Sequence, residues 1–150
     1  MTNLPTSPDQ VDVKLFGNDH VRVYRETGGA RGYDWNGSEI LLLTTTGRKS
    51  GEERTIPLCF ARDGDNLVIV ASKGGAPTHP AWYLNLQADP EVTVQVKDKV
   101  FAATARTAQS PERERLWPIA LTAWPLYDNY QHKTDREIPV VVLEPADIRP

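Results

Sequence analysis

The chain has 150 residues, of which 39% are hydrophobic and 25% are charged, and its formal net charge is −3. This composition is typical of a single globular domain, and it excludes an overall positive field that would attract nucleic acid. No apolar run reaches the roughly 20 residues of a membrane-spanning helix, and the N-terminus lacks the pattern of a secretory signal. Because Cys59 is the single cysteine, we expect no internal disulfide and a cytoplasmic location.

The first part of the chain, residues 1–38, is predicted to be a helical segment followed by a loop. The Ser-Pro pair at 7–8 fits the start of a helix, because proline is tolerated in the first turn. Gly17 is expected to interrupt this helix, and the pair Gly28-Gly29 is expected to end it. Residues 31–37 are predicted to be loop.

The second part, residues 39–150, is predicted to be a β-barrel. Short runs rich in β-branched residues predict six strands, at 39–45, 54–62, 67–72, 92–96, 100–108 and 138–145. Because most of them are joined by short turns, the pattern favours an antiparallel barrel over a parallel sheet. Pro57 cannot donate to a neighbouring strand, so it must face away from one or sit at a bulge.

Helices are predicted at two places within this barrel. Residues 79–89 have the pattern of a short helix with Pro80 near its start. A second helical segment opens at Ser110, and we expect Pro118 and Pro125 to kink it or to split it.

The stretch 44–57, "TTTGRKSGEERTIP", combines two glycines with Arg48, Lys49 and Arg54. Glycines allow backbone amides to converge on one point as an anion-binding nest, and arginine suits bidentate phosphate contacts. The spacing of a nucleotide-binding P-loop is absent. A charged hairpin tip, with glutamates at 52 and 53 neutralising the bases, is the competing interpretation.

The stretch 71–85, "ASKGGAPTHPAWYLN", joins the end of a strand to the start of a helix through two glycines. Ser72 and Lys73 stand where amides and a helix N-terminus could meet an anion. Trp82 and Asn85 are three residues apart and can share one helix face. A glycine-rich connection with Trp82 in the core is the competing interpretation.

Three aromatic residues, Trp124, Tyr127 and Tyr130, follow one another in steps of three. In a helix such steps rotate each residue by only about 60°, so the three could line one wall of a cavity. Packing in the core is the competing interpretation.

The remaining candidate residues favour no metal site and no reactive thiol. His20, His79 and His132 are far apart and lack the spacing of metal ligands. Cys59 lies in an apolar strand with no basic neighbour beside it, so a buried structural thiol is expected.

The ordered set of motifs in this chain resembles the deazaflavin-dependent nitroreductase family of actinobacteria. The motifs are, in order, G-R-K-S-G, R-x-x-P-L, S-K-G-G, P-x-W-x-x-N and A-D-P. The resemblance runs from about residue 40 to about residue 96 and resumes in the aromatic segment and the last strand. It implies a split β-barrel like that of FMN-binding barrels. It also implies an oxidoreductase that passes a hydride from reduced coenzyme F420 to a quinone, a nitroaromatic compound or an activated enone.

The resemblance also implies roles for individual residues. Those implied for coenzyme binding are Arg48, Lys49, Ser50, Arg54, Pro57, Ser72, Lys73, Gly74, Trp82 and Asn85. Those implied for the acceptor are Trp124, Tyr127 and Tyr130, and in this set Trp124 departs from the family's more frequent tyrosine. Tyr130 and Tyr127 are candidates for orienting or protonating the acceptor, and Ser72 for bonding the ring or a developing anion. No metal is expected.

Two other functions stay open at this point: an FMN-dependent split-barrel oxidoreductase and a non-catalytic deazaflavin-binding protein. The chain could be a monomer or a homodimer. Its amphipathic N-terminal segment allows contact with the inner face of a membrane near a quinone pool. Acidic residues at 9, 12 and 19 make it equally plausible that this segment covers the barrel instead.

Overall fold

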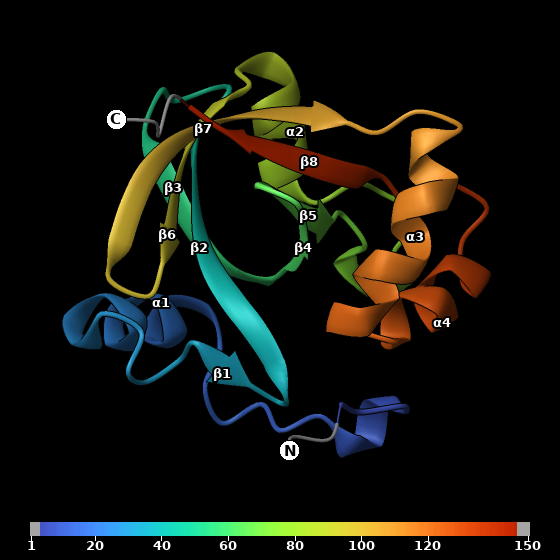
Figure 1. Ribbon diagram of the computed structural model, residues 1–150, viewed down its shortest axis with the longest axis horizontal. Helices are drawn as coiled ribbons and strands as arrows, with labels where there is room; N and C mark the ends of the chain where they lie inside the picture. Colours follow the sequence, from blue (N-terminus) through green and yellow to red (C-terminus); the bar gives the residue numbers. More distant parts are fainter. Residues whose placement is uncertain (1–3, 147–150) are drawn as a thin grey trace.

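The predicted strands pair in one curled antiparallel sheet in the computed structural model, which describes residues 4–146 (Figure 1). The strands are β1 (Asp34–Trp35), β2 (Ser38–Thr46), β3 (Glu53–Cys59), β4 (Ala61–Asp63), β5 (Asn66–Val70), β6 (Glu91–Val96), β7 (Lys99–Thr107) and β8 (Val140–Pro145). The α-helices are α1 (Gly17–Thr27), α2 (Ala81–Ala88), α3 (Glu112–Ala123) and α4 (Leu126–His132). Two short 3-10 helices are η1 (Pro8–Gln10) and η2 (Lys73–Gly75).

The sheet has the order β1-β2-β6-β7-β8-β5-β4, and β3 pairs with β2 beside this path. Every pair of neighbouring strands is antiparallel. The prediction of a mainly β, antiparallel, barrel-like fold with flanking helices is therefore confirmed.

The prediction of six strands is wrong, because the described residues form eight. The run 54–62 divides at Phe60, whose side chain is buried and whose amide donates to the Glu39 carbonyl at 3.1 Å. The predicted loop 31–37 contains β1, which returns to β2 through Asn36-Gly37 with both residues at positive φ. An Asn-Gly pair is a strong signal for a two-residue hairpin turn, so the sequence carried this information.

Pro57 lies on β3, which pairs with β2 and with no other strand among residues 4–146. An edge position of this kind tolerates proline, because the missing N–H is not needed by a second neighbour. The expectation that Pro57 faces away from a neighbouring strand fits this place.

The prediction of a helix starting at 7–8 is wrong beyond its first turn. Only η1 forms there, and the regular helix α1 begins at Gly17, the residue expected to interrupt it. Tertiary hydrogen bonds hold the intervening segment extended: the Trp35 indole donates to the Leu15 carbonyl at 2.5 Å, and Asn36 bonds both backbone groups of Asp12. Gly28 ends α1 in the left-handed conformation, as predicted.

Pro125 separates α3 from α4 as expected, and α3 continues through Pro118, so Pro118 does not split the helix. Pro118 lies on the exposed side of α3, as does Glu114, whose carbonyl loses the bond that proline cannot make. Water can therefore bond this carbonyl, which explains why the helix need not break.

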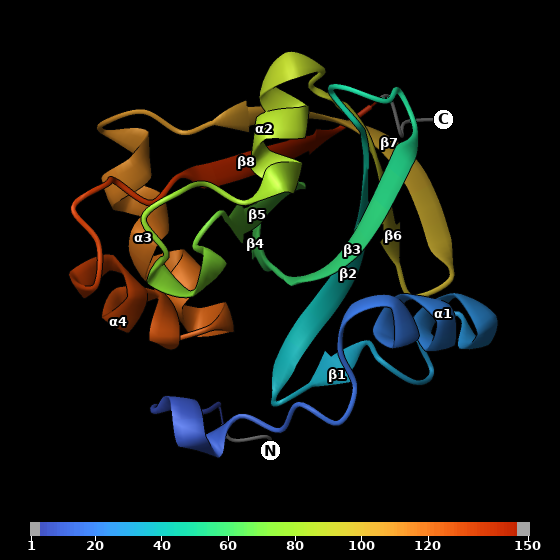
Figure 2. The same cartoon turned by 180° about the vertical axis from the view of Figure 1, so that it is seen from behind.

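The helices cover different parts of the sheet. In Figures 1 and 2, α3 and α4 lie together at one end, and α1 lies at the other end below β6 and β7. α1 buries Val21 and Tyr24 against β2, and α3 and α4 bury Leu116 and Leu126 against β5 and β8. These helices flank the place where the predicted site residues meet.

Candidate functional site

Two adjoining cavities lie beside β3 and α2. The larger, about 510 Å³, is bounded mainly by apolar and aromatic side chains, and the smaller, about 390 Å³, is bounded by basic ones. Ile56 of β3 and Trp82 of α2 belong to the walls of both. The two cavities therefore adjoin, and the pair is called the groove below, with a basic end and an aromatic end.

The basic end is built on the loop between β2 and β3, residues 47–52. Four of its amides are already bonded within the protein: Gly47 and Gly51 to loop carbonyls, Glu52 to the Ser50 hydroxyl, and Arg48 to Asn85. These four amides are therefore not available for the expected anion-binding nest. Positive charge at this end comes from the side chains of Arg48, Lys49 and Arg54.

Asn85 of α2 fixes Arg48 on this loop. Its side-chain oxygen accepts the Arg48 amide at 3.2 Å and the Arg48 guanidinium at 2.9 Å. Its amide nitrogen donates to the Thr45 hydroxyl at 3.2 Å, and the side chain is buried. Asn85 thus joins helix α2 to the β2–β3 loop, and this accounts for its presence in the groove.

Arg54 is exposed and pairs with Glu52 at 3.3 Å. With more than half of each side chain exposed, this pair contributes little to stability. The loop is thus also a charged hairpin tip in which Glu52 partly neutralises Arg54, and the two interpretations from the sequence apply together.

The aromatic end contains the S-K-G-G turn after β5. Lys73, Gly74 and Gly75 all have positive φ, which glycine adopts without strain. A Cβ on Gly75 would lie 2.8 Å from the Tyr130 carbonyl, so only glycine lets this turn approach α4 so closely. The close approach brings Ser72 and Lys73 to the same cavity as Tyr130.

An aromatic wall lines the other side of this cavity. The rings of Trp35 and Trp124 stack with centroids 5.5 Å apart, and the Trp124 indole donates to the Tyr130 hydroxyl at 3.3 Å. The Tyr127 and Tyr130 rings meet edge to face at 6.3 Å. The predicted wall of three aromatics is therefore present, although Trp124 ends α3 in an extended conformation and only the two tyrosines are helical.

Burial decides the acidity of two groups in this cavity. It raises the pKa of Tyr127 well above its ordinary value, with smaller contributions from Cys59 and Tyr130. It also raises the pKa of Cys59 to about 11. Cys59 is half-buried and borders the cavity, and its raised pKa keeps the thiol protonated near neutral pH, which fits the expected structural thiol.

All residues proposed from the sequence lie in the walls of the two cavities. The basic cavity holds Arg48, Lys49, Ser50, Arg54 and Asn85; the larger one holds Pro57, Ser72, Lys73, Gly74, Trp124, Tyr127 and Tyr130; Trp82 borders both. The competing core interpretation also has support, because Trp82, Trp124 and Tyr127 are largely buried. They pack in the core and expose one edge to the groove.

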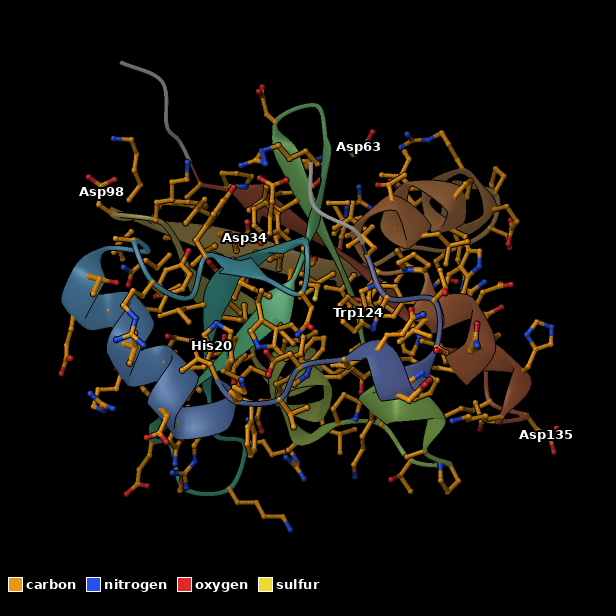
Figure 3. The ribbon with its side chains drawn as sticks, turned by 90° about the horizontal axis from the view of Figure 1, so that it is seen from below. His20, Asp34, Asp63, Asp98, Trp124 and Asp135 are labelled. Atoms are coloured by element: carbon orange, nitrogen blue, oxygen red, sulfur yellow. The ribbon has the colours of Figure 1, made fainter. Side chains whose placement is uncertain are left out.

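Several residues of the larger cavity were missed from the sequence, among them His20, Trp35, Val11 and Phe16. His20 is buried on α1, and its Nε2 bonds the Gly32 carbonyl at 2.7 Å. Gly32 leaves room for the imidazole ring, because a Cβ on residue 32 would lie 3.1 Å from it. Figure 3 shows His20 on α1 and Trp124 at the end of α3, with the N-terminal segment running from α1 towards Trp124. The apolar residues among 11–16 were the available signal, since Val11 and Phe16 border this cavity.

Residues 4–146 also bear on metal binding and on membrane crossing. In that range no group of three or more His, Cys, Asp or Glu side chains is arranged to hold a metal ion. None of the helices in that range is both long enough and apolar enough to cross a membrane.

Comparison with known proteins gives a family match over most of the chain. The family described as F420H(2)-dependent quinone reductase matches residues 17–145. The F420H(2)-dependent quinone reductase of Mycobacterium tuberculosis (strain H37Rv) is 48% identical over 128 residues, which cover 83% of this chain and 86% of the relative.

Solved structures agree with this match. A structure described as an F420-H2-dependent reductase (FDR-A) is 50% identical, covers 70% of this chain and 93% of its own, and superposes with a TM-score of 0.66. A second, described as a domain-swapped dimer, is 45% identical, covers 83% of this chain and 92% of its own, and has a TM-score of 0.69. These likenesses agree with the split-barrel fold.

Proposed function

The chain belongs to the F420H(2)-dependent quinone reductase family, an oxidoreductase family in which coenzyme F420 is the hydride carrier. We propose that the two ends of the groove bind different parts of the coenzyme and the acceptor. The basic end holds the phosphate and acidic tail of the coenzyme, and the aromatic end holds the deazaflavin ring with the acceptor above it. The observation that carries the proposal is the wall shared by the two cavities at Ile56 and Trp82. It lets one elongated molecule reach both ends.

The residues of the basic end fit an anionic tail. Arg48 is fixed by Asn85 and presents its remaining N–H donors, while Lys49 and Arg54 supply charge at the exposed rim. The Ser50 hydroxyl accepts the Glu52 amide and keeps its own proton for donation. In this proposal the tail is bound by side chains, so the affinity falls as ionic strength rises.

The residues of the aromatic end fit a flat ring. Pro57, Gly74 and Trp82 offer surfaces without charge, and Ser72 offers a hydroxyl at the entrance to the turn. The Lys73 ammonium donates to Thr78 at 3.4 Å and contributes positive charge at the same turn. When bound, the coenzyme supplies the hydride, and the protein orients the ring and excludes water.

The acceptor in this proposal lies against Trp124, Tyr127 and Tyr130. Tyr130 is the better proton donor of the two tyrosines, because burial raises the pKa of Tyr127 and makes its phenol a weaker acid. The Tyr130 hydroxyl accepts from the Trp124 indole, which leaves its own O–H free to donate to an acceptor oxygen. Trp124 thereby fixes the direction of that hydroxyl. Quinones, nitroaromatics and activated enones all offer such an oxygen.

Titration of the purified protein with F420 and with FMN tests the coenzyme, and turnover with a panel of quinones, nitroaromatics and enones tests the activity. We expect binding of F420 in preference to FMN, and oxidation of F420H2 by quinones. Preference for FMN would favour an FMN-dependent oxidoreductase, and tight binding without any turnover would favour a non-catalytic deazaflavin-binding protein.

Arg54→Ala should weaken coenzyme binding, and unchanged binding would remove Arg54 from the site.

We further propose that the protein works in the cytoplasm and meets its quinone at the inner face of the membrane. Support comes from Val13 and Phe16, which are 60% and 64% exposed on the segment beside the larger cavity. Co-sedimentation with lipid vesicles should decrease in the Phe16→Ser variant, and absence of co-sedimentation of the unaltered protein would contradict the proposal.

The oligomeric state is a separate question. Sedimentation of the protein without vesicles, in the same buffer, distinguishes a monomer from a homodimer.

A further inference from the structure

Arg136, in the connection between α4 and β8, binds the segment that carries the S-K-G-G turn. Its Nε donates to the Ala76 carbonyl at 2.8 Å, and its Nη2 donates to the Ser72 carbonyl at 2.7 Å. Its Nη1 donates to the Ala71 carbonyl at 3.3 Å and to Nδ1 of His79 at 3.0 Å. One side chain thus bonds residues at both ends of the connection between β5 and α2.

These bonds fix the peptide group that follows Ser72. The Ser72 carbonyl accepts from the Gly75 amide at 2.9 Å as well as from Arg136. The next three residues have positive φ, so the turn has little intrinsic preference for this shape. The orientation of the Ser72–Lys73 peptide beside the larger cavity therefore depends on the guanidinium.

The charge of Arg136 has no carboxylate partner within residues 4–146. Its four acceptors are three carbonyls and a histidine that must be neutral to accept. Of the two flanking acidic residues, Glu137 lies nearer Arg113, at 3.8 Å, and Asp135 is exposed. Arg136 is half-buried, and partial desolvation lowers its pKa from the ordinary value. A cation held only by neutral groups favours a nearby anion.

We propose that Arg136 is a positioning residue of the coenzyme site: it fixes the Ser72–Lys73 peptide and lends a positive charge that favours the anionic form of the deazaflavin ring. This inference rests on the proposed function. Other charged or titratable groups at the turn are Lys73, His79, Lys133 and Tyr130, and none of them bonds the Ser72 carbonyl. Arg136 is thus the charged group bonded directly to the carbonyl of Ser72, which borders the larger cavity.

The test compares Arg136→Gln, which removes the charge, with Arg136→Lys, which keeps the charge but not the forked geometry. Arg115→Gln is the control, because it removes an arginine that bonds Asp63 outside both cavities. Two readouts are needed: the Kd for oxidised F420, and the absorption change as the ring hydroxyl of the bound coenzyme ionises. The second readout responds to charge near the ring, and Arg136→Lys, which keeps the charge, separates that effect from a loss of structure.

We expect Arg136→Gln to raise the Kd by about 10-fold or more, as for loss of hydrogen bonds from a charged donor. It should also raise the pKa of the bound ring hydroxyl. Arg136→Lys should weaken binding less and leave the ionisation of the ring near that of the unaltered protein, while Arg115→Gln should change neither.

Equal Kd values and equal ring ionisation in the unaltered protein and Arg136→Gln would overturn this inference and leave the proposed function standing. If Arg136→Gln does not fold, Arg136→Lys decides: binding as tight as in the unaltered protein overturns the positioning role. Failure of the unaltered protein itself to bind F420 would overturn the proposed function and this inference together.

Discussion

The side-chain oxygen of Asn85 accepts two hydrogen bonds from Arg48, one from the backbone and one from the guanidinium, across 37 residues of sequence. Asn85 therefore determines both the course of the β2–β3 loop and the direction of its best-fixed cation. This relationship explains why a neutral, buried amide belongs to a basic site.

Replacing Asn85 with alanine tests this relationship. We expect a loss of about 1–3 kcal/mol in the free energy of unfolding, because buried bonds to a charged group are lost. Coenzyme binding should weaken as well, since Arg48 loses its fixed direction. Denaturant unfolding and coenzyme titration measure the two effects. Asn18→Ala, at an exposed position on α1, is the control and should change neither; unchanged binding in Asn85→Ala would contradict the role of Arg48.

Gly75→Ala tests the contact between the S-K-G-G turn and α4. Gly64→Ala is a matched control, because Gly64 also has positive φ but no atom within 4 Å of an added Cβ. We expect the control to lose about 1 kcal/mol from backbone strain, and Gly75→Ala to lose about 1–3 kcal/mol more from the clash with Tyr130. Turnover should fall in Gly75→Ala alone. Equal losses of stability in the two variants would show that the contact can relax freely.

Tyr130→Phe tests the proposed proton donor. Turnover with a quinone should fall about 100-fold, the scale of a lost general acid, while the coenzyme Kd stays unchanged. Tyr127→Phe should lower turnover less, because the raised pKa of Tyr127 makes it a poor donor. Tyr83→Phe, which removes a bond to Thr107 outside the cavities, is the control. A weaker coenzyme affinity with normal turnover in Tyr130→Phe would refute the donor role.

The bond from Arg136 to His79 predicts a dependence of stability on pH. Burial first, and the charge of Arg136 second, lower the pKa of His79 below its ordinary value of 6.5. The unfolded chain therefore binds a proton at a pH where the folded chain does not. The stabilisation is present above 6.5 and is lost as the pH falls through 6.5 towards the lower folded pKa.

The free energy of unfolding, measured in urea at several pH values, should fall more steeply with acid in the unaltered protein than in His79→Asn. Asparagine offers an acceptor near the position of Nδ1 and does not titrate, so it removes this one contribution. Carboxylates such as Asp63 and Glu112, whose pKa values are lowered by arginine partners, contribute equally in both proteins. Parallel pH profiles of the two proteins would exclude His79 as the source.

Much of the barrel follows from the sequence. Alternating apolar residues and turn residues predicted the strands to within a few positions, and Gly28 correctly ended α1. The errors have local causes. Asn36-Gly37 is a hairpin signal that accounts for β1, and the exposed Pro118 lies inside α3 without splitting it.

The motifs of the sequence identified every proposed coenzyme and acceptor residue, but they did not determine how these residues meet. Spacing within a helix or strand reports which side chains share a face, and that information is local. The join between Arg48 and Asn85, the approach of Gly75 to Tyr130 and the stack of Trp35 on Trp124 depend on segments far apart in sequence. The sequence by itself therefore determined the family, most of the strands and the kinds of side chain that line the groove. The tertiary structure decided that one groove joins the basic and aromatic ends, because side chains from separate segments form its walls only after close packing brings them together.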